Sequence, residues 1–174
     1  MENRNKIIIS LLIYQALTVK EIAALVIQDI NLVKGEIFIK GSQEATSKSP
    51  KSRTLPLHAK QVLLIDNYLK QDRGRLLKYN KETLEKDYFI LGQYGENINP
   101  HIISKAINEH RSKADRIPPK KIRQSVIANL LKKEQDTRIV QEFSGHRNTA
   151  TTVQYKQTEF EALQQAIKQY HPIR

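Results

Sequence analysis

Residues 118–155 read PPKKIRQSVIANLLKKEQDTRIVQEFSGHRNTATTVQY, and this stretch decides the fold. The two prolines at its start cost a helix little, because a proline in the first helical turn loses no hydrogen bond. We therefore expect a helix over 118–133, with a buried stripe formed by Val126, Ile127, Leu130 and Leu131. A second helix is expected over 136–144, and Gly145 is suited to end it.

Most of the remaining chain also has helical periodicity. Residues 5–16 are apolar almost all round, as in a core helix. Thr18 and Glu21 have the spacing of a capping box, so a helix is expected from Thr18 to about Gln28. A helix over 59–71 and a less regular stretch to about Leu91 should follow. Further helices are predicted over 100–113 and 158–169.

Two short β-rich runs, Glu36–Ile39 and Arg53–Leu57, predict a hairpin. The polar, Ser- and Lys-rich segment Gly41–Ser52 between them is expected to be a long mobile loop. Pro56 should lie at the edge of the hairpin, where no ladder donor is needed. The fold class is therefore mainly α with a small antiparallel β-hairpin or sheet (α+β), in one domain.

The composition indicates a soluble globular protein with a polyanionic partner. Lys plus Arg number 29 against 18 acidic residues in 174, which gives a net charge of +11 and a pI near 9.8. Such a surplus favours nucleic acid first and anionic membrane second, although a basic surface also occurs without either partner. The most apolar run, Ile7–Ile13, is too short to span a bilayer and lacks a signal-peptide cleavage site. The chain has no cysteine, which excludes disulfides and thiolate metal sites.

Three features near the C-terminus are candidates for chemistry. Lys120, Lys121 and Arg123 place three cations on the first turn of a helix. Gly145-His146-Arg147 follows the next helix, and Tyr155 comes nine residues after His146. Each has a structural interpretation when taken singly: a solvated helix face, a structural histidine and a packing tyrosine. Their order and spacing together need a further explanation.

The ordered set resembles the catalytic domain of the tyrosine recombinase (phage integrase) family. That family has H-x-x-R at a helix start, an L-G-H turn, and a nucleophilic tyrosine nine residues after that histidine. Here the pattern reads Lys120-x-x-Arg123, Ser144-Gly145-His146 and Tyr155. The family's R-x-x-E-x-x-x-L-x-x-x-D-[IL] appears as the segment Thr18–Ile30, and its K-x-R-x-[VL]-P-L as Lys51–Leu57. The family's hairpin lysine corresponds to Lys48, and the resemblance covers the chain from Ile7 to Ile167.

The resemblance implies a site-specific recombinase or integrase that cleaves and rejoins DNA strands through a covalent 3′-phosphotyrosyl intermediate. Tyr155 would be the nucleophile, Arg123 would bind the scissile phosphate and His146 would donate a hydrogen bond to it. Lys48 would protonate the leaving 5′-oxygen, with Lys120 as a further catalytic group. Fixed cationic donors stabilise such a transition state without a metal, so neither metal nor cofactor is expected. The expected DNA-binding residues are Lys20, Lys51, Arg53, Lys121 and Arg147.

Two positions depart from the family pattern. Lys120 replaces the first histidine and can still bind a phosphate or transfer a proton. Thr18 replaces the first catalytic arginine, and losing one such donor costs on the order of 100- to 1,000-fold in rate. Three explanations fit: another cation such as Lys20 takes its place, a slow enzyme tolerates the loss, or the chain binds DNA without cutting it. The alternative functions are thus an impaired recombinase-like regulator or decoy, and a basic helical module unrelated to recombinases.

The organisation and partners follow from the same resemblance. Residues 1–174 are expected to form one catalytic domain that starts on its first helix, without the family's N-terminal core-binding domain. The partner is double-stranded DNA, on which the protein should assemble into a multimer, and neither a membrane nor a small-molecule substrate is expected. A final helix from Phe160 to about Tyr170 should dock on a neighbouring subunit or pack on its own domain. The location is cytoplasmic, with association to the nucleoid when DNA is bound.

Overall fold

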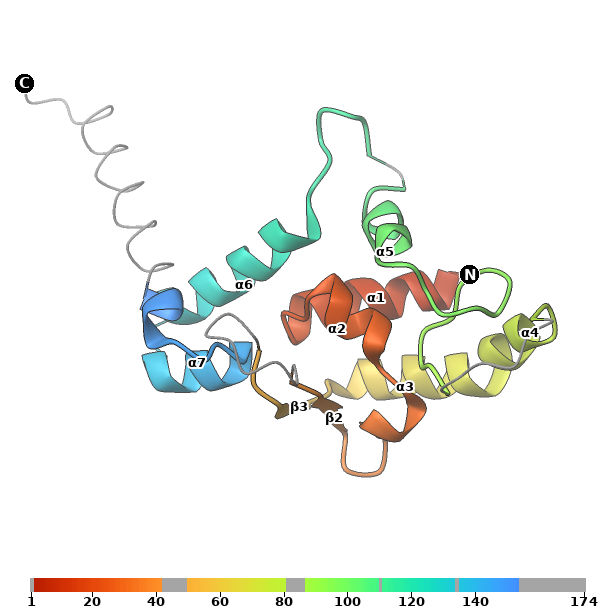
Figure 1. Ribbon diagram of the computed structural model, residues 1–174, viewed down its shortest axis with the longest axis horizontal. Helices are drawn as coiled ribbons and strands as arrows, with labels where there is room; N and C mark the ends of the chain where they lie inside the picture. The colour runs from red at the N-terminus through yellow and green to blue at the C-terminus, as the bar shows by residue number, and fades with distance from the viewer. Residues whose placement is uncertain (1, 42–49, 81–86, 110, 134, 154–174) are drawn as a thin grey trace, which may run out of the picture.

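The structure is a computed structural model that describes residues 2–41, 50–80, 87–109, 111–133 and 135–153 (Figure 1). Its central helix, α1 (Glu2–Tyr14), contacts α3 (Ala59–Asn67), α5 (Pro100–Ile107) and α6 (Pro119–Lys132). The short helix α2 (Val19–Ala24) also packs on α5. Figure 1 shows α6 and α7 (Thr137–Ser144) on one side of α1, and α3 with the short helix α4 (Gly74–Leu77) on the other.

A three-stranded antiparallel sheet completes the fold. Its order is β1 (Ile30–Asn31), β2 (Glu36–Ile39), β3 (Arg53–Pro56), so the predicted hairpin is confirmed and β1 is an addition. Pro56 lies at the end of the edge strand β3, as expected. Successive strand residues face opposite sides, and β3 therefore turns Leu55 and Arg53 to the buried side. The mainly α architecture with a small antiparallel sheet is confirmed.

Three predicted helices end more than two residues away from the ends that the sequence predicts. The helix from Thr18 ends at Ala24 rather than at Gln28, because the Asp29 carboxylate accepts from the Val26 amide (3.0 Å) and starts a separate 3-10 turn, η1 (Ile27–Asp29). The helix over 59–71 continues through the wider π-helical turn η2 (Tyr68–Arg73) into α4 (Gly74–Leu77).

The helix expected over 100–113 ends at Ile107. The side chain of Asn108 donates to the carbonyls of Ser104 (2.9 Å) and Ile117 (3.1 Å) and accepts from the Ile117 amide (2.8 Å). These bonds turn the chain away from the helix axis. The helix predicted over 158–169, including the segment from Phe160, lies outside the described residues.

The core is divided into two clusters. The larger one contains the apolar residues of α1, the sheet and α3, and Ile65 and Tyr68 are fully buried in it. The smaller cluster joins α6 to α7 through Ile127, Leu131 and Val140. Val126 and Leu130 are half-buried, so the predicted stripe on α6 is narrower than expected. Among the described residues, no helix combines the length and apolar content needed to cross a membrane.

Candidate active site

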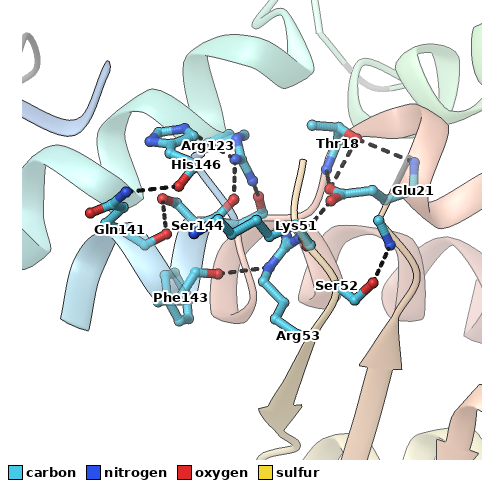
Figure 2. Close-up of polar contacts among 12 residues, drawn as sticks. Thr18, Glu21, Lys51, Ser52, Arg53, Arg123, Gln141, Phe143, Ser144 and His146 are labelled. Atoms are coloured by element: carbon cyan, nitrogen blue, oxygen red, sulfur yellow. Dashed lines mark hydrogen bonds and ion pairs between the residues drawn. The ribbon is translucent and has the colours of Figure 1, made fainter. Parts of the chain in front are cut away.

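Arg123 joins three parts of the fold at one point (Figure 2). It lies in the first half of α6, where its Nη1 donates to the carbonyl of Ala16, just after α1. Its Nη2 donates to the carbonyl of Ser144 at the end of α7 (2.6 Å) and lies 3.3 Å from Nε2 of His146. Since a guanidinium is a rigid planar fork, these contacts fix both its position and its plane.

The turn that carries His146 is held from two sides. Gly145 ends α7 in the left-handed conformation (φ 71°), and the His146 amide donates to the carbonyl of Gln141 (3.1 Å). The side chain of Gln141 donates in return to the carbonyls of His146 (3.1 Å) and Arg147 (3.2 Å). On the other side, the Lys51 amide donates to the Gly145 carbonyl (2.9 Å). The turn is thereby attached to the chain that leads into β3.

Arg53 lies directly beneath this turn. Its Nε donates to the Phe143 carbonyl (2.8 Å), and its Nη1 pairs with Oε1 of Glu21 (2.7 Å). A Cβ atom at position 145 would lie 2.5 Å from Arg53 Nη1, which explains the glycine there beyond its backbone angle. The Arg53 side chain is only 3% exposed. A side chain that is almost fully covered cannot reach a phosphate from this position. Arg53 is therefore not one of the DNA contacts proposed below.

Glu21 connects α2 to this cluster. Burial alone would raise the pKa of its carboxyl, but the hydrogen bond and charge of Arg53, aided by the Thr18 amide and by Arg123, lower the pKa overall. Its second oxygen accepts from the Thr18 amide (2.8 Å) and hydroxyl (3.0 Å). The predicted capping box is confirmed, since the Thr18 hydroxyl also accepts from the Glu21 amide (3.2 Å). Thr18 thus has a structural role at the position where an arginine was expected.

His146 is held in its neutral form. Burial, followed by the positive charges of Arg123 and Arg53, lowers the pKa of its imidazole to about 4, against a smaller opposing effect of Glu21. Its Nδ1 lies 3.0 Å from the hydroxyl of Thr152, which is fully buried. At neutral pH the ring therefore acts as an uncharged donor and acceptor.

The side chains of the remaining predicted site residues either take no part in the hydrogen bonds described above or lie outside the described residues. Lys120 and Lys121 are exposed on the first turn of α6, and Lys120 lies three residues before Arg123, on a neighbouring part of the helix surface. Lys20 on α2 and Lys51 before β3 are also exposed, while Arg147 is half-buried. Tyr155 and Lys48 lie outside the described residues. Within the described part of the chain, no group of His, Cys, Asp and Glu side chains could hold a metal ion.

Sequence reasoning did not assign four residues that shape the site. Glu21 was identified as part of a capping box and of the motif at Thr18–Ile30 but was given no role in the site, and Thr152 was given no role. Ala16 adopts a left-handed conformation (φ 50°) that carries its carbonyl to Arg123, which nothing in an alanine signals. Gln141 looks like any polar residue of an amphipathic helix. Glu21 and Ala16 act through residues that are 32 and 107 positions away. Thr152 and Gln141 act through a turn that brings residues five or six positions apart into contact. The spacing of residue types reveals neither kind of contact.

Comparison with known proteins identifies the class to which this fold belongs. The chain belongs to the phage integrase family, whose model matches residues 1–162. It is 27% identical over 172 residues to the tyrosine recombinase XerC of Natranaerobius thermophilus, covering 97% of this chain and 56% of that protein. It is 29% identical over 172 residues to XerD of Staphylococcus haemolyticus, covering 97% and 55%.

Solved structures show the same fold. The crystal structure of XerA recombinase superposes with a TM-score of 0.73 at 22% identity, over 99% of this chain and 60% of that one. A post-cleavage complex of XerH site-specific recombinase bound to a palindromic difH substrate gives 0.71 at 22% identity, over 94% and 45%. The chain spans about half the length of the curated relatives it matches.

Proposed function

We propose that this chain is the catalytic part of a site-specific DNA recombinase or integrase, which cleaves and rejoins strands through a 3′-phosphotyrosyl bond to Tyr155. The observation that carries the proposal is the meeting of Arg123 and His146 at 3.3 Å on a turn fixed by β3. Tyr155 follows that turn by nine residues in the sequence. The family membership and the XerH complex with its difH substrate support the same function.

The chemistry assigns each group a task. Oxygen Oη of Tyr155 attacks the phosphorus, the bond from phosphorus to the 5′-oxygen breaks, and the phenol proton is released. Arg123 pairs with two non-bridging oxygens, and neutral His146 donates to one of them. Lys48 gives a proton to the leaving 5′-oxygen, and Lys120 contributes positive charge beside Arg123. The 5′-hydroxyl later attacks the phosphotyrosine and restores the backbone, so bond energy is conserved.

DNA recognition rests on three exposed lysines and one half-buried arginine. Lys20, Lys51, Lys121 and Arg147 are the proposed phosphate contacts, in a chain with a net charge of +11. Binding should weaken steeply as salt rises, because phosphate contacts release counterions. We further propose that the chain assembles into a multimer on DNA and is associated with the nucleoid when bound. A flat salt response would contradict DNA as the partner.

One observation favours the second candidate, a DNA-binding relative with impaired cleavage. Thr18 stands where the family has an arginine, and its hydroxyl and amide are both bonded to Glu21. Position 18 therefore supplies no positive charge to a bound phosphate. This candidate and the enzyme share the DNA partner and differ in whether a covalent product forms.

A nicked suicide substrate separates the two candidates. Such a DNA loses a short strand on cleavage and traps the covalent complex, which migrates as a slower band on a denaturing gel. We expect an adduct with the chain as it stands and none with Tyr155→Phe, while both bind the DNA equally. Binding without any adduct would establish the second candidate.

A further inference from the structure

Thr152 is a buried polar residue beside the candidate active site that the chemistry above does not use. Residues 149–153 form a helical turn, which begins where the side chain of Asn148 accepts from the Ala150 amide (2.9 Å) and its carbonyl accepts from the Thr151 amide (3.2 Å). This turn buries Thr152 completely, while the neighbouring Thr151 stays exposed. The Thr152 hydroxyl lies 3.0 Å from Nδ1 of His146.

The partners of His146 determine which ring nitrogen carries the proton. A guanidinium has only donors, so Arg123 Nη2 donates and Nε2 of His146 accepts across their 3.3 Å contact. A neutral imidazole has one donor and one acceptor nitrogen, and Nδ1 therefore carries the proton and donates to Thr152. The lowered pKa of His146, about 4, is consistent with a neutral ring.

The proposed function, on which this inference rests, needs the opposite tautomer. To donate to the scissile phosphate, His146 must carry its proton on Nε2, the nitrogen that faces Arg123. When phosphate draws the Arg123 donors to itself, Nε2 takes a proton from solvent and Nδ1 releases one, so the net charge of the ring does not change. Nδ1 then needs a donor. A carbonyl or carboxylate beside it could not serve, whereas a hydroxyl both accepts and donates.

We propose that Thr152 is a positioning residue whose hydroxyl rotates between accepting from Nδ1 and donating to it, and so keeps His146 in place in both tautomers. The hydroxyl is suited to this role because the helical turn fixes its oxygen while leaving its hydrogen free to rotate. Thr152 touches no reacting atom in this scheme. It acts only through His146.

The first test measures the tautomer directly in the protein without DNA. In protein labelled with ¹⁵N-histidine, the ring nitrogens of His146, assigned by comparison with His146→Gln, report which one carries the proton. We expect the proton on Nδ1 in the unchanged protein and in Thr152→Ser, which keeps the hydroxyl. Thr152→Val keeps the shape and removes the hydroxyl, so a proton on Nδ1 would be buried without an acceptor, while Arg123 Nη2 keeps the Ser144 carbonyl as a partner. The preference for Nδ1 should therefore weaken. The matched control, Thr151→Val, changes the exposed neighbour and should leave the spectrum unchanged.

The second test measures cleavage of the nicked substrate at saturating DNA. Loss of the residue that orients a metal-bound histidine costs about 10- to 100-fold. We expect a cost of the same order here, so Thr152→Val should slow adduct formation by about that factor with unchanged DNA affinity. Thr152→Ser should restore most of the rate. A proton on Nε2 in the unchanged protein, or Thr152→Val with unaltered tautomer and rate, would overturn the proposal.

The two tests also separate this inference from the proposed function. If no adduct forms with any variant but the tautomer responds to Thr152→Val, the recombinase function fails and the contact stands. If the adduct forms with equal rates in all variants, the function stands and the role of Thr152 fails. Should Thr152→Val not fold, Thr152→Ser and the tautomer of the unchanged protein still decide the question.

Discussion

The buried pair of Arg53 and Glu21 is expected to hold the His146 turn, and replacing Arg53 with Met tests this. The two side chains are 3% and 6% exposed and meet at 2.7 Å. Removing one partner of such a pair leaves an uncompensated buried charge and costs about 3–5 kcal/mol. We expect Arg53→Met to lower the free energy of unfolding by that amount, measured by urea denaturation followed by circular dichroism.

A matched exposed pair provides the control. Lys70 and Asp66 also meet at 2.8 Å, but their side chains are 71% and 38% exposed, four residues apart on one helical segment. Breaking an exposed pair of this kind costs only about 0.3–0.5 kcal/mol. Lys70→Met should therefore change the midpoint of urea denaturation very little.

A double-mutant cycle measures the coupling between Glu21 and Arg53. Glu21→Gln together with Arg53→Met leaves no buried charge without a partner, and it should cost less than the sum of the single variants, with a coupling of about 0.5–3 kcal/mol. An Arg53→Met variant as stable as Lys70→Met, or strictly additive single costs, would refute the idea that this ion pair holds the turn.

Three further predictions concern the site and its surroundings. Gly145→Ala should destabilise the protein by about 1–3 kcal/mol, because residue 145 has a positive φ and Arg53 lies close to it. Gly74→Ala is the control and should be neutral or stabilising, since nothing lies within 4 Å of a Cβ atom at that position. Thermal melts of both variants check this prediction. The free energy of unfolding should fall as pH drops from 6.5 toward 4, because the pKa of His146 is about 4 in the folded protein and the unfolded chain takes up the proton first. In urea titrations at several pH values, His146→Gln should show a smaller dependence on pH over this range. The same pH dependence in both proteins would contradict the prediction. Thr18→Arg should raise the rate of adduct formation on the nicked substrate even though loss of the cap costs about 1 kcal/mol, and an unchanged rate would mean that another cation already supplies that charge.

Local patterns predicted much of the fold because local physics determines those parts. Prolines at 118 and 119, the Thr18–Glu21 spacing and Gly145 mark helix ends through hydrogen bonds within a few residues, and all three appear in the structure. The hairpin followed from β-rich runs around a polar loop. The early end of the helix at Ala24 was missed, because the competing Asp29 turn looks like a continuation of the helical pattern.

The site was less accessible to prediction. Arg123 and His146 were found through their spacing, and the structure brings them together. Arg53 was expected to contact DNA, as part of the family's motif at Lys51–Leu57. It lies instead on the inner face of β3, where it pairs with Glu21 and is covered. Ala16 acts through a left-handed backbone that carries its carbonyl to the distant Arg123, and Thr152 acts through a turn that brings it back to His146, six residues earlier. No pattern in a single sequence encodes either.

The most direct test of the recombinase account is to identify the covalent bond itself. After trapping on the nicked substrate, the protein is digested and the nucleotide-bearing peptide is sequenced by tandem mass spectrometry. We expect a 3′-phosphoryl nucleotide on Tyr155 and a free 5′-hydroxyl on the released strand. A nucleotide on another residue, a 5′-phosphoryl bond, or bound DNA that yields no modified peptide would contradict the account.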